Sequence, residues 1–78
     1  MTNQTTQIAA QRQHERIPTY YLLQFEELTN AELASMARDD LCPDKWRTFC
    51  GWELEYREAA NIEVYYDDKA DQIKRRKA

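Results

Sequence analysis

The apolar residues of segment 20–28 are spaced so that they would share one face of a helix. They recur three and four positions apart: Tyr21, Leu22, Phe25 and Leu28. This spacing predicts a helix over residues 20–28. A strand is the competing interpretation, because Thr19 and the two tyrosines after it are typical of strands and the segment is short. The two adjacent leucines, followed by two glutamates, favour the helix.

The next segment opens with a helix-capping signal. Thr29 and Glu32 have the spacing of a capping box, in which the threonine hydroxyl accepts a bond from the backbone amide three residues on and the glutamate reaches back. The helix that follows turns Leu33 and Met36 inward and ends before Pro43.

Pro43 suits the start of a helix and opens the longest element. The apolar positions of this element keep the three-four spacing: Phe49, Trp52, Tyr56 and Ala59. The same spacing continues through Glu63, Tyr66, Ala70 and Ile73. We therefore predict one long C-terminal helix, bent near Asn61, and an all-α fold, a small helical bundle in which two short helices accompany this long one.

The residues after Asn61 also fit a second interpretation. Ile62, Val64 and Tyr66 would share one face of a strand. A lone strand needs a partner, and residues 19–25 are the segment that could supply one. The alternative is therefore an α+β fold with short strands near residues 19–25 and 62–66.

The chain has 78 residues, which is enough for one domain. Residues 1–16 are rich in Thr, Asn, Gln and Arg, so we expect a polar N-terminal arm followed by a single helical domain over residues 17–78. A chain this short buries only about 60% of its unfolded surface, so a partner surface is a natural source of added stability.

Acidic residues outnumber basic ones, 14 against 11, for a net charge of -3. They predominate from Glu53 to Asp71, and basic residues 74–77 close the chain. This balance argues against direct binding of nucleic acid, whose phosphates select basic surfaces. A helix-turn-helix-like pair at residues 29–37 and 43–56 keeps a DNA-binding transcriptional regulator as an alternative, although the second of these helices is acidic.

Residue types that carry catalysis or bind metals are scarce in this chain. Cys42, Cys50 and His14, which is expected to be solvated in the arm, fall short of the four ligands that a zinc site needs. None has a neighbour that would activate a nucleophile. We therefore expect no enzyme, no metal and no cofactor. Reduced cysteines, with no export signal or membrane span, indicate the cytoplasm and no membrane partner.

The predicted long helix carries more aromatic and acidic side chains than two short helices would cover. Its outer part is therefore expected to project and to bind another protein, such as a nucleic-acid-binding protein. The predicted partner-binding residues are Trp52, Glu53, Tyr56, Glu63, Tyr65, Tyr66, Asp67 and Asp68. A homo-oligomer is expected through a seam of Phe49, Trp52, Tyr56, Ala59 and Tyr66.

The hypothesis that follows is a non-enzymatic protein-binding regulator or inhibitor that acts by occupying the surface of its partner. In general character (short, glycine-poor, with a polar leader and an acidic helix) the chain resembles accessory proteins of phages and mobile elements. Many of these bind and neutralise one host or phage protein, which implies an antirepressor or anti-defence role. A self-assembling structural subunit is a further alternative.

Overall fold

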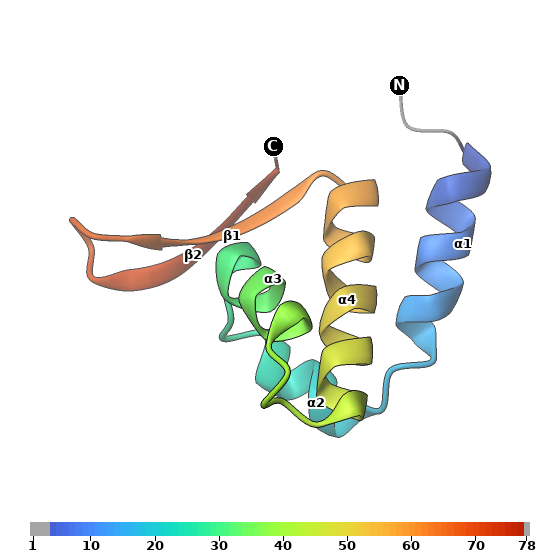
Figure 1. The fold of residues 1–78 in the computed structure, drawn as a ribbon. Helices are drawn as coiled ribbons and strands as arrows, with labels where there is room; N and C mark the ends of the chain where they lie inside the picture. The colour runs from blue at the N-terminus through green and yellow to red at the C-terminus, as the bar shows by residue number, and fades with distance from the viewer. Residues whose placement is uncertain (1–3, 78) are drawn as a thin grey trace.

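The computed structural model describes residues 4–77 and shows a helical body followed by a β-hairpin (Figure 1). The elements are α1 Gln4–Glu15, α2 Thr19–Phe25, α3 Asn30–Arg38, α4 Asp44–Ala59, β1 Ile62–Asp67 and β2 Gln72–Lys77. The predicted all-α bundle with one long C-terminal helix is wrong, because the last helix ends at Ala59. The alternative α+β fold is correct as a class.

Helix α4 forms the centre of the helical body, with α1 on one side and α3 on the other (Figure 1). The core they enclose is small, and its buried residues are Ile17, Phe25, Leu33 and Cys50. Half-buried aromatic residues of α2 and α4 extend this core. Tyr21 meets both Trp46 and Phe49 edge-on, with ring centroids 4.8 Å apart in each pair, a geometry that adds to the stabilisation from burial.

The capping box predicted at the start of α3 is confirmed. The amide of Glu32 donates to Thr29 Oγ1 at 3.1 Å, and the amide of Thr29 donates to Glu32 Oε1 at 3.0 Å. The helix predicted over residues 20–28 is also confirmed as α2, which ends earlier, at Phe25.

A single left-handed residue ends α4 and redirects the chain. Asn61 has φ 57°, a conformation that asparagine tolerates better than most residues and that commonly follows the last turn of a helix. Ile62 and Val64, which are β-branched, and the two tyrosines after them then favour a strand. The three-four spacing of Tyr66 and Ile73 therefore does not reflect a helix.

Strands β1 and β2 pair antiparallel, with Val64 opposite Arg75 and Tyr66 opposite Ile73. The connecting turn is held by Asp67, whose Oδ1 accepts the backbone N–H groups of the second and third residues after it at 3.0 and 3.3 Å. Residues 19–25, the expected strand partner, form α2 instead. The actual partner is β2, whose mostly charged sequence lacks the alternation that marks a strand.

The N-terminal segment is not separate from the helical body where the structure describes it. Helix α1 lies along α4, Ala10 is buried, and Gln7 Nε2 donates to the carbonyl of Ala59 at 3.2 Å. Residues 1–3 of the predicted arm lie outside the described residues. Within residues 4–77, no helix combines the length and the apolar character needed to cross a membrane.

Candidate functional site

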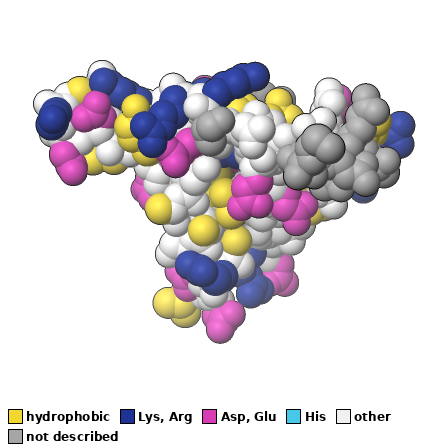
Figure 2. All heavy atoms as spheres, turned by 90° about the horizontal axis from the view of Figure 1, so that it is seen from above, with side chains coloured by type: hydrophobic (Ala, Val, Ile, Leu, Met, Phe, Trp, Pro, Cys, Tyr) yellow, Lys and Arg dark blue, Asp and Glu magenta, His cyan; other side chains and the backbone are white. Residues whose placement is uncertain are grey.

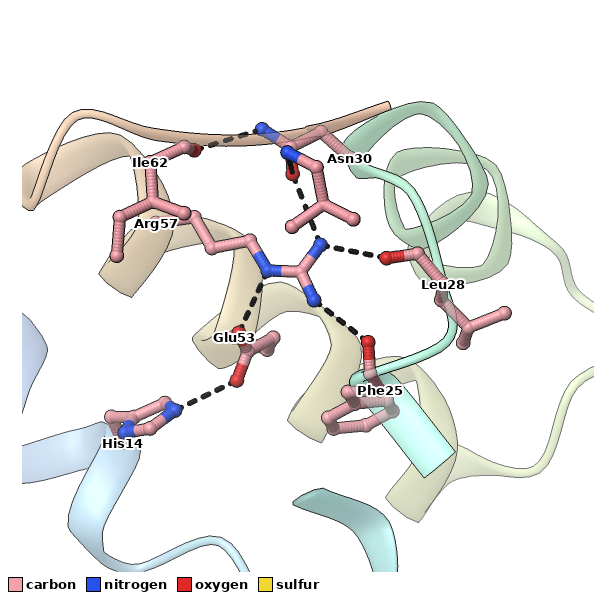
Figure 3. Close-up of polar contacts among 8 residues, drawn as sticks. His14, Phe25, Leu28, Asn30, Glu53, Arg57 and Ile62 are labelled. Atoms are coloured by element: carbon pink, nitrogen blue, oxygen red, sulfur yellow. Dashed lines mark hydrogen bonds and ion pairs between the residues drawn. The ribbon is translucent and has the colours of Figure 1, made fainter. Parts of the chain in front are cut away.

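A buried ionic network joins the helical body to the hairpin, and Arg57 of α4 is its centre (Figure 3). Its side chain is 1% exposed. Arg57 Nε donates to Glu53 Oε2 at 2.8 Å, Nη2 donates to the carbonyl of Phe25 at 2.7 Å, and Nη1 donates to the carbonyl of Leu28 at 2.9 Å. The arginine thus binds the carbonyl of Phe25, the last residue of α2, which also accepts from the backbone N–H of Leu28 at 3.0 Å, and the carbonyl of Leu28 in the turn that follows.

Asn30, the first residue of α3, connects this network to β1. Its Oδ1 accepts from Arg57 Nη1 at 3.0 Å and from the backbone N–H of Val64 at 3.2 Å. Its Nδ2 donates to the carbonyl of Ile62 at 3.2 Å. One amide side chain therefore fixes the start of the hairpin against both α3 and α4.

His14 of α1 completes the network on the opposite side. Its Nε2 lies 2.7 Å from Glu53 Oε1, and its ring stacks on Tyr56 with centroids 3.8 Å apart. The expectation that His14 is solvated in a loose arm is therefore wrong. Glu53 and Arg57 lie four residues apart on α4, the spacing at which opposite charges on one helix meet.

The network stabilises the fold and has little capacity to bind a ligand. Burial lowers the pKa of Arg57, and the charge of Glu53 together with its hydrogen bond opposes that shift. Four of the five guanidinium N–H groups already have partners in the protein. A pocket of about 200 Å³ borders the network, lined by His14, Leu22, Glu26, Glu53, Tyr56, Arg57 and Arg75.

The predicted binding residues on α4 are engaged within the molecule. Glu53 belongs to the network, Tyr56 stacks on His14, and Trp52 lies edge-on to Phe49 with centroids 5.3 Å apart. The guanidinium of Arg16 sits 5.7 Å from the Trp52 ring. The predicted seam has four members on α4, namely Phe49, Trp52, Tyr56 and Ala59. The last three of these contact α1 or Arg16, the residue that follows α1. Tyr66 lies away from them on β1.

The predicted binding residues on the hairpin fall on two faces. On one face, Arg76 Nε donates to Glu63 Oε1 at 2.7 Å and its guanidinium lies 4.4 Å from the Tyr65 ring. Asp67 Oδ2 lies 2.8 Å from Lys74 Nζ on the same face. This contact holds the pKa of Asp67 below its usual value and raises the pKa of Lys74. These charges largely neutralise one another.

The opposite face of the hairpin carries an exposed apolar pair. Tyr66 is 49% exposed and Ile73, directly opposite on β2, is 40% exposed. We call these two residues the tip patch. The Tyr66 hydroxyl donates to Asp71 in the turn, beside the exposed Asp68. The predicted binding residues include Tyr66 and Asp68 but not Ile73, because its cross-strand contact depends on a register that the sequence does not reveal.

The hairpin projects from the body and presents mixed chemistry. Figure 2 shows basic, acidic and apolar side chains interspersed along the projecting arm. A cavity of about 770 Å³ lies between the tip patch and the start of α3, lined by Glu27, Thr29, Glu32, Tyr66, Asp71, Gln72 and Ile73. A second cavity, of about 430 Å³, separates the end of β2 from α1 and is lined by Gln7, Gln11, Tyr56, Ala59, Ala60, Asn61 and Lys77.

The two cysteines are free thiols in different surroundings. Burial, followed by the charges of Cys42 and Glu53, raises the pKa of Cys50 to about 11. Because the thiolate is the reactive form, we expect iodoacetamide at pH 8 to label half-buried Cys42 at least about a hundredfold faster than Cys50. Peptide mapping by mass spectrometry measures both rates. In urea the two should converge, and equal rates in the native protein would contradict the buried position of Cys50.

Metal ligation and similarity to known proteins are two further guides to what the residues that the structure describes could do. Within residues 4–77, no group of three or more His, Cys, Asp or Glu side chains is placed to hold a metal ion. No known protein family, curated protein or solved structure matches this chain. The projecting hairpin is the candidate functional site because it exposes the apolar tip patch.

Proposed function

We propose that this protein is a non-enzymatic regulator or inhibitor that binds another protein through its hairpin. In this proposal the helical body is a scaffold that holds the hairpin out. Occupying a partner's surface is then the whole activity, as in an antirepressor or an anti-defence protein. A cytoplasmic location belongs to the same proposal, since both cysteines are free thiols.

The observation that carries the proposal is the exposed tip patch on a poorly supported hairpin. Strand β1 packs on α3 and α4, but β2 packs chiefly on β1. An isolated two-stranded hairpin is marginally stable in water. Tyr66 and Ile73 nevertheless stay about half exposed at its outer end, and aromatic residues in such positions are enriched at protein interfaces.

This support differs from the reason first given for a protein partner. The sequence suggested a long helix with uncovered aromatic residues, whereas α4 ends at Ala59 and its aromatic face meets α1 and the core. The hairpin, not a helix, now supplies the projecting surface. A second copy of the chain remains one of the proteins that the surface could bind.

The test compares the wild-type chain with a double variant, Tyr66→Ser with Ile73→Ser. Each tagged full-length protein is used to capture partners from a lysate of the organism that encodes it, and each candidate is then purified and bound again. We expect a partner that forms a complex of defined stoichiometry with the wild type and binds the double variant at least about tenfold more weakly, because truncating an anchor residue at an interface commonly costs that much.

Leu41→Ser is the matched control. Leu41 is 93% exposed but lies in the loop before α4, so losing it should leave binding unchanged. A partner that binds the double variant as tightly as the wild type would remove the tip patch from the interface and contradict the observation that carries the proposal. The proposal as a whole would be contradicted if no partner were purified and light scattering showed the chain to be a monomer.

DNA binding is the second candidate, because a hairpin with four consecutive basic residues follows the helix pair α3 and α4. Its support is weaker. Arg47, at the start of α4, pairs with Asp40 and Asp44, and the exposed side of α4 carries Glu55 and Glu58, which would repel phosphates. Saturable binding to a random DNA duplex that weakens steeply with salt would favour this function over a protein partner.

A further inference from the structure

The outer edge of β2 offers a row of backbone groups for pairing. Because the N–H of Val64 and the carbonyl of Ile62 bond to Asn30, both residues turn these groups away from β2. In an antiparallel pair the residues opposite them, Arg75 and Lys77, then turn theirs away from β1. No hydrogen bond to these outward groups is found among the described residues.

The space beside this edge is a furrow rather than packed protein. Lys77 lines the cavity of about 430 Å³ that separates β2 from Gln7 and Gln11 of α1. Arg75 lines the pocket of about 200 Å³ beside His14. Tyr56 of α4 lines both of them. An extended segment paired with β2 would lie in this furrow.

A second copy of the chain is a poor occupant of the edge. Two β2 strands paired antiparallel about Arg75 would place arginine opposite arginine and Lys74 opposite Arg76. Like charges directly opposite one another destabilise a sheet. Strand β1 of a second copy is no better, since its own outer edge is bound by Asn30 at Ile62 and Val64.

The charges at the edge define a suitable occupant. On the other face of the hairpin, Lys74 and Arg76 pair with acidic residues, whereas Arg75 and Lys77 are exposed and have no ion pair among the described residues. Glu26 lines the same pocket as Arg75 without pairing to it. The alternating free cations thus face the furrow, two residues apart on one side of the strand.

We propose that β2 binds an acidic extended segment of the partner protein, which adds to the hairpin as a third strand. The segment carries Asp or Glu at alternate positions, opposite Arg75 and Lys77. This inference rests on the proposed function and specifies the chemistry of the partner. Backbone bonds to β2 supply affinity and the alternating carboxylates supply specificity, as in other cases of strand addition.

The test uses the full chain and a fluorescein-labelled peptide, Val-Glu-Val-Glu-Val-Glu-Val, with binding measured by fluorescence anisotropy at low salt. A peptide with Lys in place of each Glu should bind at least about tenfold more weakly. We expect the added strand to run antiparallel to β2. Its Glu residues, opposite Arg75 and Lys77, then turn their N–H groups towards β2, and its Val residues turn theirs away. N-methylation of the Glu residues should therefore weaken binding about tenfold or more, and N-methylation of the Val residues by less than about twofold.

A charge reversal tests the protein side. Arg75→Glu should weaken binding of the Glu peptide about tenfold and improve binding of the Lys peptide, while Arg38→Glu, the same change on α3, leaves both unaltered. No saturable binding of the Glu peptide, or equal losses from the two N-methylated peptides, would overturn strand addition. So would displacement of the peptide by oligo-dT at lower concentration. The lysate experiment does not depend on the peptide experiment. If the peptide fails to bind but a captured partner binds the tip-patch variant more weakly than the wild type, strand addition is overturned and protein binding by the hairpin stays supported.

Discussion

Replacing Arg57 with methionine should lower the free energy of unfolding by about 3 to 5 kcal/mol, the cost typical of removing one partner from a buried ion pair. The reason is what the change leaves behind. Glu53 stays buried as a charge with only His14 beside it. The carbonyl of Leu28 loses the guanidinium as its partner, and the carbonyl of Phe25 keeps only the bond from the backbone N–H of Leu28. For a domain this small, such a loss is a large fraction of the whole stability.

Urea unfolding followed by far-ultraviolet circular dichroism measures this effect. Arg38→Met is the matched control, since Arg38 is exposed at the end of α3 and its loss should cost less than about 1 kcal/mol. The double variant Arg57→Met with Glu53→Leu should be less destabilised than the sum of its two single changes, because it leaves no unpaired charge. An unchanged urea midpoint for Arg57→Met would show that the network contributes nothing to the fold.

The helices of the body could be predicted because their signals are local. A capping box lies within four residues, and Thr29 with Glu32 forms one as expected. Pro43 also precedes α4 directly, as the N-cap residue. Such signals depend on backbone groups of the same turn, so they hold in many tertiary surroundings.

The hairpin could not be predicted in the same way, because its signals are divided between two separate segments. The stretch after Asn61 fits a strand and a helix almost equally well, since Tyr66 continues both the three-four spacing of the helix and the alternation set by Ile62 and Val64. Two interactions make this stretch a strand. The left-handed conformation of Asn61 ends α4, and Asn30 forms hydrogen bonds to β1. Neither interaction leaves a periodic pattern in the sequence.

The candidate site was predicted only in part for the same reason. The i to i+4 pair of Glu53 and Arg57 is visible in the sequence, but the partners that bury it come from α1, α2 and α3. A charged pair on an amphipathic helix is ordinarily solvent-exposed. Its burial here depends on long-range contacts, and these same contacts turn the aromatic face of α4 inward and leave the hairpin as the projecting surface.

The hairpin's orientation depends on one amide side chain, and this gives the second large effect. Asn30→Ala should destabilise the protein by about 2 to 4 kcal/mol. It leaves the backbone N–H of Val64, a residue that is 2% exposed, without a hydrogen-bond acceptor, and it removes a partner of Arg57. Unlike Arg57→Met, it should act mainly where the hairpin joins the body. We therefore expect amide hydrogen exchange to accelerate most in β1 and β2 and least in α4.

Asn30→Asp separates the two halves of this interaction. Aspartate keeps an acceptor for Val64 and Arg57 but cannot donate to the carbonyl of Ile62, so its loss of stability should be smaller than that of the alanine variant. Ser35→Ala, an exposed change on the same helix, controls for effects on α3 itself. Uniform acceleration of exchange across all elements would mean that hairpin and body unfold as one unit. The hairpin would then be part of the folding core, and a scaffold that merely presents it would be the wrong description.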